Sequence, residues 1–376
     1  MPYRRRHHAP TALCLVALIL GCGDDVVMNP PPATGSLAIT TASVGSAIDA
    51  DGYTVLLDGS AMGVIGASDS VNSDVAVGQY EVELTGLADN CGVIGENPVS
   101  TTIVEGALVT VGFSVACPPF FDYIAFTWDD IYVMEAEGSI PVSVTAHLDL
   151  ADAAYLDWSP DGTRLAWRVF GIDGYDLQVM RVDGSEPITI DLPPVFCVHS
   201  LEWTPDGTRI GFAGGGENHD VWVVEADGSN LTNLTNSTAE EMEATWSPDG
   251  SQIMFVRSMP ELGLWVMDAD GSNDNLLPAL DIGFDLHWSP DGGQILYSCG
   301  LAGTGVDVCV MDSDASNPVN LTDHPQDNWA PDWSPDGTRI AFFSRRDGGG
   351  IFVMNADGSD VSFLVEGGQP AWSPRE

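Results

Sequence analysis

The stretch Trp158-Ser-Pro-Asp-Gly162 is the clearest repeating feature of this chain. Further copies lie at Trp203-Thr-Pro-Asp-Gly207, Trp246-Ser-Pro-Asp-Gly250, Trp288-Ser-Pro-Asp-Gly292 and Trp333-Ser-Pro-Asp-Gly337, with a shortened one at Trp372-Ser-Pro374. Successive tryptophans are between 39 and 45 residues apart. A period near 40 residues is typical of an array of small β-sheets, so the sequence predicts a repeat protein of the all-β class.

Each repeat predicts four short strands. The first strand ends at the motif tryptophan, and Ser-Pro-Asp-Gly then forms a tight turn, because Pro presets φ, Asp tolerates the third position and Gly adopts the left-handed one. An apolar strand such as Leu165-Ala-Trp167 follows, and a third such as Leu177-Gln-Val-Met180 ends in an Asp-Gly-Ser turn at Asp183. An outer strand, as at Ile188-Thr-Ile190, completes the unit. Four antiparallel strands at this period form one blade of a β-propeller.

The number of blades follows from two incomplete units. Five complete units extend from Trp158 to Val365. Residues 123–139 supply a second and a third strand without a first, whereas residues 369–372 supply a first strand alone. The two fragments complement each other, so we expect six blades, with the C-terminal strand inserted as the inner strand of the first blade. This closure leaves no open terminal blade.

The repeated Trp-Ser-Pro-Asp-Gly-Thr-Arg-Ile-Ala-Phe, followed by Val-Met-Asn-Ala-Asp-Gly-Ser, resembles the TolB-type six-bladed β-propeller, a WD40-like repeat architecture. The resemblance covers residues 121–376 and implies a binding protein of the cell envelope rather than an enzyme. TolB itself belongs to the Tol-Pal system. The chain departs from TolB in an expected lipid anchor and in an N-terminal domain that is all-β where TolB has an α/β domain. A Tol-Pal role is therefore the weaker of the envelope hypotheses.

Residues 36–117 predict a separate domain. Short apolar strands are separated here by Gly, Asp and Asn turns, and Tyr80-Glu-Val-Glu-Leu84 alternates apolar and polar side chains like a half-buried antiparallel strand. About seven such strands indicate a small β-sandwich. The stretch Gly78-Gln-Tyr-Glu-Val-Glu-Leu-Thr-Gly86 is similar to a strand of PEGA-like surface domains. We expect this domain to act as a spacer or in adhesion.

Residues 1–22 have the pattern of an export signal. Three arginines precede an apolar stretch that is too short to span a bilayer, and small residues lead to Cys22. This resembles the bacterial lipobox, which implies lipidation of Cys22. The alternative is an ordinary signal peptide with a chance cysteine. Residues 23–35 are Pro-rich and predict a stiff tether. In the families that share this signal, Asp directly after the cysteine favours retention in the inner membrane, whereas this chain has Gly23 there. The resemblance therefore implies an exported protein anchored by lipid to the outer membrane, on its periplasmic side or at the cell surface.

The chain has 55 acidic residues, 12 arginines and no lysine, for a formal net charge of -43. This charge argues against binding of nucleic acid and against docking on anionic lipid through a basic patch. It is explained either by an acidic surface suited to salty surroundings or by attraction of cations or of a basic partner. We expect a monomer.

Four cysteines can form disulfides in an exported protein. They are Cys91 and Cys117 near the end of the N-terminal domain, and Cys299 and Cys309 on two adjacent predicted strands. Cys197 is left over. Neither Cys-x-x-Cys nor clustered histidines support zinc, so we expect no metal and no cofactor.

The two faces of the predicted disc differ. The Pro-Asp-Gly and Asp-Gly-Ser turns share one face and are almost uniform, as expected of a structural solution. The other face collects variable loops, at residues 213–220, 299–306 and 344–350. Because loops on a rigid scaffold usually carry binding residues, this variable face is the place to expect a site.

Alignment of the repeats on the motif tryptophan gives candidate site residues. Six residues before it, four repeats carry a carboxylate: Asp152, Glu240, Asp327 and Glu366. Four residues before it lie His199 and Trp329, among others. If these positions ring the channel mouth, the mouth is acidic with aromatic and histidine contacts, and suits a cation, an amine or a basic peptide. In so acidic a chain, the same pattern also fits ordinary exposed surface.

The sequence therefore predicts an envelope binding or scaffold protein whose propeller engages a protein or peptide partner through the variable face. The alternative is a propeller-type hydrolase or lyase that acts on carbohydrate or peptide with carboxylates at the channel mouth. No Gly-x-Ser-x-Gly elbow is present, and no two histidines are spaced as a pair in the repeat. We expect no catalytic residues, although the fold alone does not exclude an activity.

Overall fold

The structure is a computed structural model in which residues 33–45, 52–88, 91–117, 120–146, 148, 153–171, 173–259, 262–278, 283–300 and 305–374 are described. The export signal, Cys22, most of the tether and Asp152 lie outside the described residues. Across these ranges, no helix is both long and apolar enough to cross a membrane.

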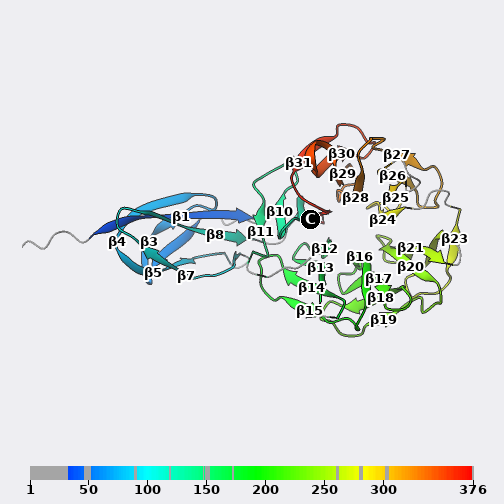
Figure 1. Ribbon diagram of the computed structural model, residues 1–376, viewed down its shortest axis with the longest axis horizontal. Helices are drawn as coiled ribbons and strands as arrows, with labels where there is room; N and C mark the ends of the chain where they lie inside the picture. The colour runs from blue at the N-terminus through cyan, green and yellow to red at the C-terminus, as the bar shows by residue number, and fades with distance from the viewer. Residues whose placement is uncertain are drawn as a thin grey trace, which may run out of the picture.

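Six four-stranded antiparallel sheets are arranged as blades around a common centre (Figure 1). From the centre outward, blade 1 contains β32 (Pro370–Trp372), β9 (Tyr123–Thr127), β10 (Ile131–Glu135) and β11 (Val142–Ser143). Blade 2 contains β12 (Ala154–Trp158), β13 (Arg164–Phe170), β14 (Tyr175–Arg181) and β15 (Ile188–Ile190). Blade 3 contains β16 (Cys197–Trp203), β17 (Arg209–Gly215), β18 (Asp220–Glu225) and β19 (Thr232–Asn233).

The remaining blades repeat this order. Blade 4 contains β20 (Glu240–Trp246), β21 (Gln252–Met259), β22 (Gly263–Asp268) and β23 (Asn275–Leu277). Blade 5 contains β24 (Phe284–Trp288), β25 (Gln294–Cys299), β26 (Asp307–Asp312) and β27 (Val319–Asn320). Blade 6 contains β28 (Asn328–Trp333), β29 (Arg339–Ser344), β30 (Gly350–Asn355) and β31 (Ser362–Val365), with the short 3-10 helix η1 (Arg346–Gly348) between β29 and β30.

The motif turn is stabilised by its own side chains. Ser159 Oγ donates to Asp161 Oδ1 at 2.6 Å and accepts from the amide of Arg164 at 2.9 Å. Asp161 Oδ1 also accepts from the amide and the hydroxyl of Thr163, at 3.0 and 2.8 Å. Gly162 has φ 66°, a left-handed conformation that favours glycine. The Ser, Asp and Gly residues of the motif therefore each have a role within the turn, which explains why they recur in the repeats.

The C-terminal strand completes blade 1, as the two sequence fragments predict. In the antiparallel pairing of β32 with β9, Ala371 lies opposite Ala125 and Trp372 opposite Ile124. The amide of Tyr123 donates to Ser373 Oγ at 2.8 Å. Residues far apart in sequence thus share one sheet, and both ends of the blade array are paired.

The apolar core of the propeller lies between the blades. Trp203 packs with Ala166 and Leu177 of blade 2, and Trp372 packs with Ala341 and Ile351 of blade 6. A Cβ atom at Gly211 in β17 would lie 2.1 Å from the ring of Trp246, so a side chain there would displace the indole. The motif tryptophans therefore join each blade to the one before it.

The N-terminal domain consists of two four-stranded sheets around one apolar cluster. Its strands are β1 (Thr34–Val44), β2 (Tyr53–Leu57), β3 (Ser60–Ile65), β4 (Ser70–Ala76), β5 (Gly78–Thr85), β6 (Gly92–Ile94), β7 (Val99–Ile103) and β8 (Leu108–Ala116). The sheet orders are β4-β1-β8-β6 and β3-β2-β5-β7. The sequence predicts about seven strands, and it undercounts because β4 consists largely of polar residues. Strand β1 also begins just before the expected boundary at residue 36.

The two domains meet at the first blades. Val44, Ile94 and Ala116 of the sandwich belong to the same buried cluster as Phe120 and Trp158. The hydroxyl of Tyr123 accepts from the amide of Gly45 at 3.1 Å and donates to its carbonyl at 3.2 Å. The sandwich therefore packs against the rim of the propeller and extends away from it (Figure 1).

Both expected disulfides are confirmed. Cys91 is bonded to Cys117 at the end of the sandwich, and Cys299 is bonded to Cys309 between β25 and β26 of blade 5. Cys197 is a free, partly buried thiol.

We predict that Trp372→Ala lowers the free energy of unfolding by about 3–5 kcal/mol, because it leaves a cavity where the C-terminal strand joins blades 1 and 6. Urea denaturation measures this difference. The control is Phe363→Ala, whose side chain is 54% exposed and should cost about 0.5 kcal/mol or less. Equal effects of the two variants would contradict the role of the C-terminal strand in closing the ring.

Candidate functional site

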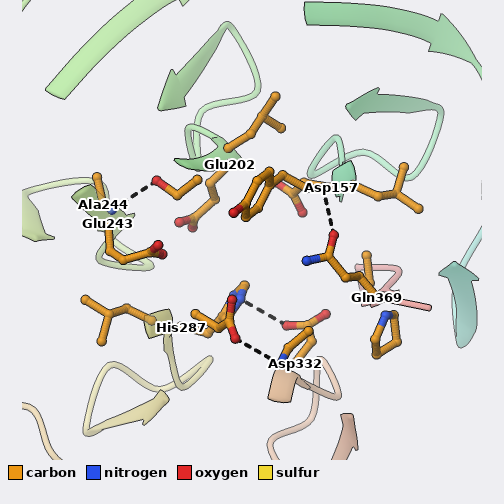
Figure 2. Close-up of a pocket in the computed structure, with 16 residues that line it drawn as sticks. Asp157, Glu202, Glu243, Ala244, His287, Asp332 and Gln369 are labelled. Atoms are coloured by element: carbon orange, nitrogen blue, oxygen red, sulfur yellow. Dashed lines mark hydrogen bonds and ion pairs between the residues drawn. The ribbon is translucent and has the colours of Figure 1, made fainter. Parts of the chain in front are cut away.

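A narrow channel passes between the inner strands, and it is lined with acidic side chains. Its waist has a volume of about 60 Å³ and is lined by residues that include Asp157, Glu202, Glu243, Asp285 and Asp332. Figure 2 shows Asp157, Glu202, Glu243 and Asp332 converging from separate blades, with His287 beside Asp332. The imidazole Nδ1 of His287 lies 3.7 Å from Asp332 Oδ1. The centre of the propeller thus gathers acidic side chains from several blades.

The carboxylates closest to the motif tryptophans connect neighbouring blades. Asp157 of blade 2 accepts a hydrogen bond from the backbone amide of Trp203 in blade 3, at 2.6 Å. Glu202 accepts from the amide of Trp246 at 3.2 Å in the same way. Asp332 of blade 6 accepts from the amide of Trp372 in blade 1, at 2.5 Å. These amides lie on the channel edge of the inner strands, where no further strand can pair with them.

A second set of such bonds uses side-chain acceptors that lie three residues before the motif tryptophan instead of one. Gln369 Oε1 accepts from the amide of Tyr155 at 2.9 Å, and Asp285 Oδ2 accepts from the amide of Ala330 at 3.0 Å. Ser200 Oγ accepts from the amide of Ala244 at 3.1 Å. Tyr155 and Ala330 have φ values of 54° and 49° and lie where β12 and β28 bulge. The bulges direct these amides toward the preceding blade.

Enclosure of these carboxylates changes their protonation. The pKa of Asp157 is raised to about 7, because burial and the charge of Asp332 together outweigh the hydrogen bonds from the amides of Trp203 and Trp158, which lower it. Burial raises the pKa of Glu202 and of Glu243 well above the ordinary value. Asp157 and Glu202 are partly exposed, but only to the narrow channel, so water stabilises their charge poorly.

The channel opens into a wider cavity on the variable face, which we call the mouth. Its volume is about 550 Å³, within the range of ligand sites. Four side chains that precede the motif tryptophans by four residues line it: His199, Met242, Phe284 and Trp329. Glu243 and Asp285 belong both to the mouth and to the waist. The mouth therefore has largely apolar walls above an acidic base.

The other opening of the channel lies on the face of the motif turns. Its volume is about 240 Å³, and it is lined by the motif tryptophans and prolines. Asp157, Glu202 and Asp332 reach this opening from the waist.

Of the expected site residues, His199, Asp327 and Trp329 come together at the mouth. Asp327 Oδ2 pairs with Arg345 Nη1 at 3.0 Å, and the guanidinium lies over the ring of Trp329 at 5.0 Å. The mouth is thus less acidic than the sequence suggests, because this carboxylate is balanced by an arginine.

Glu240 and Glu366 lie elsewhere. Glu240 Oε2 pairs with His219 Nδ1 at 3.2 Å, and Glu366 lines a separate cleft. The rings of His219 and His199 lie 4.5 Å apart, so two histidines that are not spaced as a pair in the repeat come into contact in the fold. Burial lowers the pKa of His199, and the charges of His219 and Arg168 lower it further. The histidine contact was missed because it joins two segments that have no fixed spacing in the repeat.

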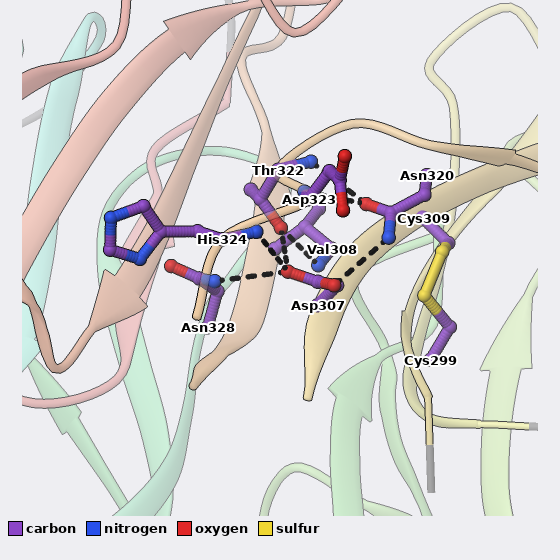
Figure 3. Close-up of a disulfide and its surroundings, with 9 residues drawn as sticks. All are labelled: Cys299, Asp307, Val308, Cys309, Asn320, Thr322, Asp323, His324 and Asn328. Carbon is purple, nitrogen blue, oxygen red and sulfur yellow. Dashed lines mark hydrogen bonds between the residues drawn. A yellow bond between two sulfur atoms is a disulfide. The ribbon is translucent and has the colours of Figure 1, made fainter. Parts of the chain in front are cut away.

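Polar clusters hold the segments that lead into the inner strands. In Figure 3, Asp307 accepts from the hydroxyl of Thr322 at 2.6 Å and from the side-chain amides of Asn320 and Asn328 at 2.9 and 3.2 Å. Its pKa is lowered because these hydrogen bonds outweigh the effect of burial. The segment just before Trp329 is therefore fixed.

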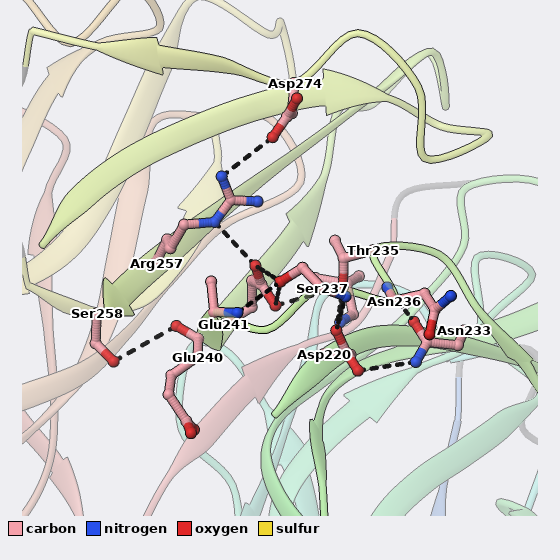
Figure 4. Close-up of polar contacts among 12 residues, drawn as sticks. Asp220, Asn233, Thr235, Asn236, Ser237, Glu240, Glu241, Arg257, Ser258 and Asp274 are labelled. Carbon is pink, nitrogen blue, oxygen red and sulfur yellow. Dashed lines mark hydrogen bonds and ion pairs between the residues drawn. The ribbon is translucent and has the colours of Figure 1, made fainter. Parts of the chain in front are cut away.

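Blade 3 repeats this arrangement at the segment before β20. Asp220 accepts from the hydroxyl of Thr235 and from the side-chain amide of Asn233, at 2.9 and 2.8 Å (Figure 4). Beside it, fully buried Glu241 pairs with Arg257 at 2.9 Å. The variable face is thus rigid where its loops enter the blades.

Within the described residues, no three His, Cys, Asp or Glu side chains are placed to hold a metal ion. The carboxylates of the waist are not among the residues expected from the sequence. Asp157, Glu202 and Asp332 each directly precede a motif tryptophan, so the signal was present one residue before the motif rather than six.

Comparison with solved structures gives strong similarity in fold. TolB from Acinetobacter baumannii superimposes with a TM-score of 0.57 at 15% identity, over 80% of this chain and 81% of that one. The fold is therefore that of a TolB-type propeller. A chain of a nidogen/laminin complex superimposes at 0.54 and 14% identity, over 66% of this chain and 97% of that one. Kuenenia stuttgartiensis hydrazine synthase superimposes with a TM-score of 0.51 at 14% identity, over 66% of this chain and 46% of that one. No protein-family model matches the sequence, and neither does any curated protein.

We predict that Asp157 makes the TolB-type propeller less stable as the pH rises through about 7. Its pKa is 3.8 ordinarily and about 7 when folded, so the folded state holds an extra proton between these values. The resulting stabilisation is complete below about pH 4 and lost above about pH 7. Asp157→Asn removes the titrating group and keeps one oxygen for the amide of Trp203, but it loses the acceptor for the amide of Trp158. Its stability relative to the parent should therefore be about 1–2 kcal/mol more favourable at about pH 8 than at about pH 5.

Urea denaturation of Asp157→Asn between about pH 5 and pH 8 checks this, and we expect a flatter dependence than in the parent. The control is Asp249→Asn in a motif turn. Hydrogen bonds from Ser251 and Ser247 lower the pKa of Asp249 to about 2, so its effect on pH dependence is confined to more acidic solutions. A dependence unchanged by Asp157→Asn would contradict the assignment.

Proposed function

We propose that this chain is a lipid-anchored envelope protein whose propeller binds a protein or peptide partner at the mouth. The observation that carries the proposal is the cavity itself. It combines a ligand-sized volume, partly exposed apolar and aromatic walls at Met242, Phe284 and Trp329, and carboxyl groups at its base. Such a cavity accepts an inserted side chain or chain end, and the carboxyl groups at its base can pair with one that has a positive charge.

Export is supported by two independent features. The arginine-rich and apolar segment before Cys22 has the pattern of a signal, and two disulfides join described residues. Disulfides form and persist in oxidising compartments. We propose that lipid on Cys22 and the tether at residues 23–35 hold the sandwich and the propeller at the outer membrane, as a monomer.

The neighbours in fold agree with a binding role without defining the partner. One of them is a chain of a nidogen/laminin complex. At these identities the similarity extends to the fold alone, and hydrazine synthase has the same architecture in part of its chain. The proposal therefore rests on the mouth rather than on ancestry.

An enzyme that acts on carbohydrate or peptide is the alternative, and the raised pKa of Glu243 at the base of the mouth favours it. A waist of about 60 Å³ is too small for a sugar ring, so a substrate could reach Glu243 only from the mouth. Turnover that is lost in Glu243→Gln, with folding retained, would support this alternative over simple binding.

To test the binding proposal, a variant with the photocrosslinking residue benzoylphenylalanine in place of Phe284 is irradiated in an envelope extract. We expect a discrete cross-linked protein that a second change, Trp329→Ala, reduces at least about ten-fold, because the aromatic wall is lost. The matched control carries the same crosslinker at Phe170, which is 56% exposed and does not line the mouth. Equal products from both positions, or none from Phe284, would contradict the proposal.

A further inference from the structure

A second cavity lies on the variable face where blade 6 meets blade 1, and we call it the aromatic cleft. It has a volume of about 500 Å³. Trp128, Phe343 and Phe363 supply its aromatic walls, and Asp347 and Glu366 supply carboxylates. It is distinct from the mouth, because the two cavities share no lining residue.

The aromatic walls are exposed although they are large and apolar. Trp128 is 59% exposed and Phe363 is 54% exposed. Phe343 is supported from behind by Trp329, with ring centroids 4.4 Å apart, and Phe363 contacts the edge of Phe352 at 5.4 Å. Two of the three rings are therefore held in place before any ligand arrives, which lowers the entropic cost of binding.

The carboxylates of the cleft are not neutralised. Within the described part of the chain, neither Asp347 nor Glu366 has an ion-pair or hydrogen-bond partner for its side chain. The two nearby arginines make their hydrogen bonds and ion pairs with other residues, although Arg346 also interacts electrostatically with Asp347. Arg345 pairs with Asp327, and Arg346 donates to Ser344 and Asn328. The cleft thus presents negative charge beside three aromatic rings.

Two glycines that line the cleft lie close against blade 1. A Cβ atom at Gly367 would lie 2.6 Å from the ring of Phe126, and one at Gly368 would lie 2.8 Å from the carbonyl oxygen of Thr127. Side chains at these positions would not fit the present backbone. Glycine at both positions therefore lets this segment pack directly against β9 at the edge of the cleft.

We propose that the aromatic cleft binds a small organic ammonium ligand of the choline type. Aromatic faces attract cations through their quadrupole, and the attraction is largest for alkylammonium groups that shed water easily. Unpaired carboxylates add Coulombic attraction and disfavour a ligand that carries a phosphate beside its ammonium group. An uncharged sugar would use the aromatic faces, but it would leave the negative charge of the cleft uncompensated.

Titration calorimetry with choline and with its uncharged analogue 3,3-dimethyl-1-butanol tests this proposal. We expect choline to bind with a Kd of about 1–10 mM and the analogue at least about ten-fold more weakly. Trp128→Ala should abolish detectable binding, and Glu366→Gln should weaken it about three- to ten-fold. Both side chains are exposed, so the variants should fold.

His199→Ala is the control, because it alters the mouth and leaves the aromatic cleft intact. Choline affinity unchanged in this variant supports a separate site, so the cleft and the mouth can fail independently. Equal affinity for choline and its analogue, displacement by N-acetylglucosamine, binding unaffected by Trp128→Ala, or no binding up to about 100 mM would overturn the proposal.

Discussion

The propeller depends on hydrogen bonds that cross from the side chain of one inner strand to the backbone amide of the next. An inner strand is paired on its outer side only, and its other edge faces a channel too narrow for a further strand. Unpaired amides there would be costly. Asp157, Glu202 and Asp332 satisfy them at one level, and Ser200 and Gln369 satisfy them at another. These hydrogen bonds therefore fix both the spacing between neighbouring blades and the ends of their inner strands.

This arrangement explains why the channel is acidic without requiring a metal or a reaction. A carboxylate is a strong acceptor for a backbone amide, and one stands directly before the motif tryptophan in three of the six repeats, at Asp157, Glu202 and Asp332. The consequence is electrostatic strain. Charges from several blades converge on a small space, and burial raises the pKa of Asp157 and of Glu202. The acidic residues of the channel thus serve first to join the blades. Glu243 belongs to both the waist and the mouth, so the acidic lining extends to the base of the mouth.

The sequence predicts the fold well because the decisive chemistry is local. Ser159, Asp161 and Gly162 stabilise their turn with no distant partner, so the motif marks every blade and the closure by β32 can be counted. The site is predicted only in part. His199 and Trp329 reach the mouth as aligned, whereas Glu240 turns to His219 and Glu366 to another cleft. Those outcomes depend on loops whose lengths differ between blades, which a repeat alignment does not describe.

Hydrogen exchange of individual backbone amides measures the central constraint most directly. The amides of Trp203, Trp246 and Trp372 have no partner in a β-ladder but receive carboxylate acceptors from the preceding blade. We predict that they exchange as slowly as amides in the middle strands, and that Asp157→Ala accelerates exchange at Trp203 more than at Trp372. Rapid exchange at all three amides in the parent chain would show that these bonds do not hold the inner strands together.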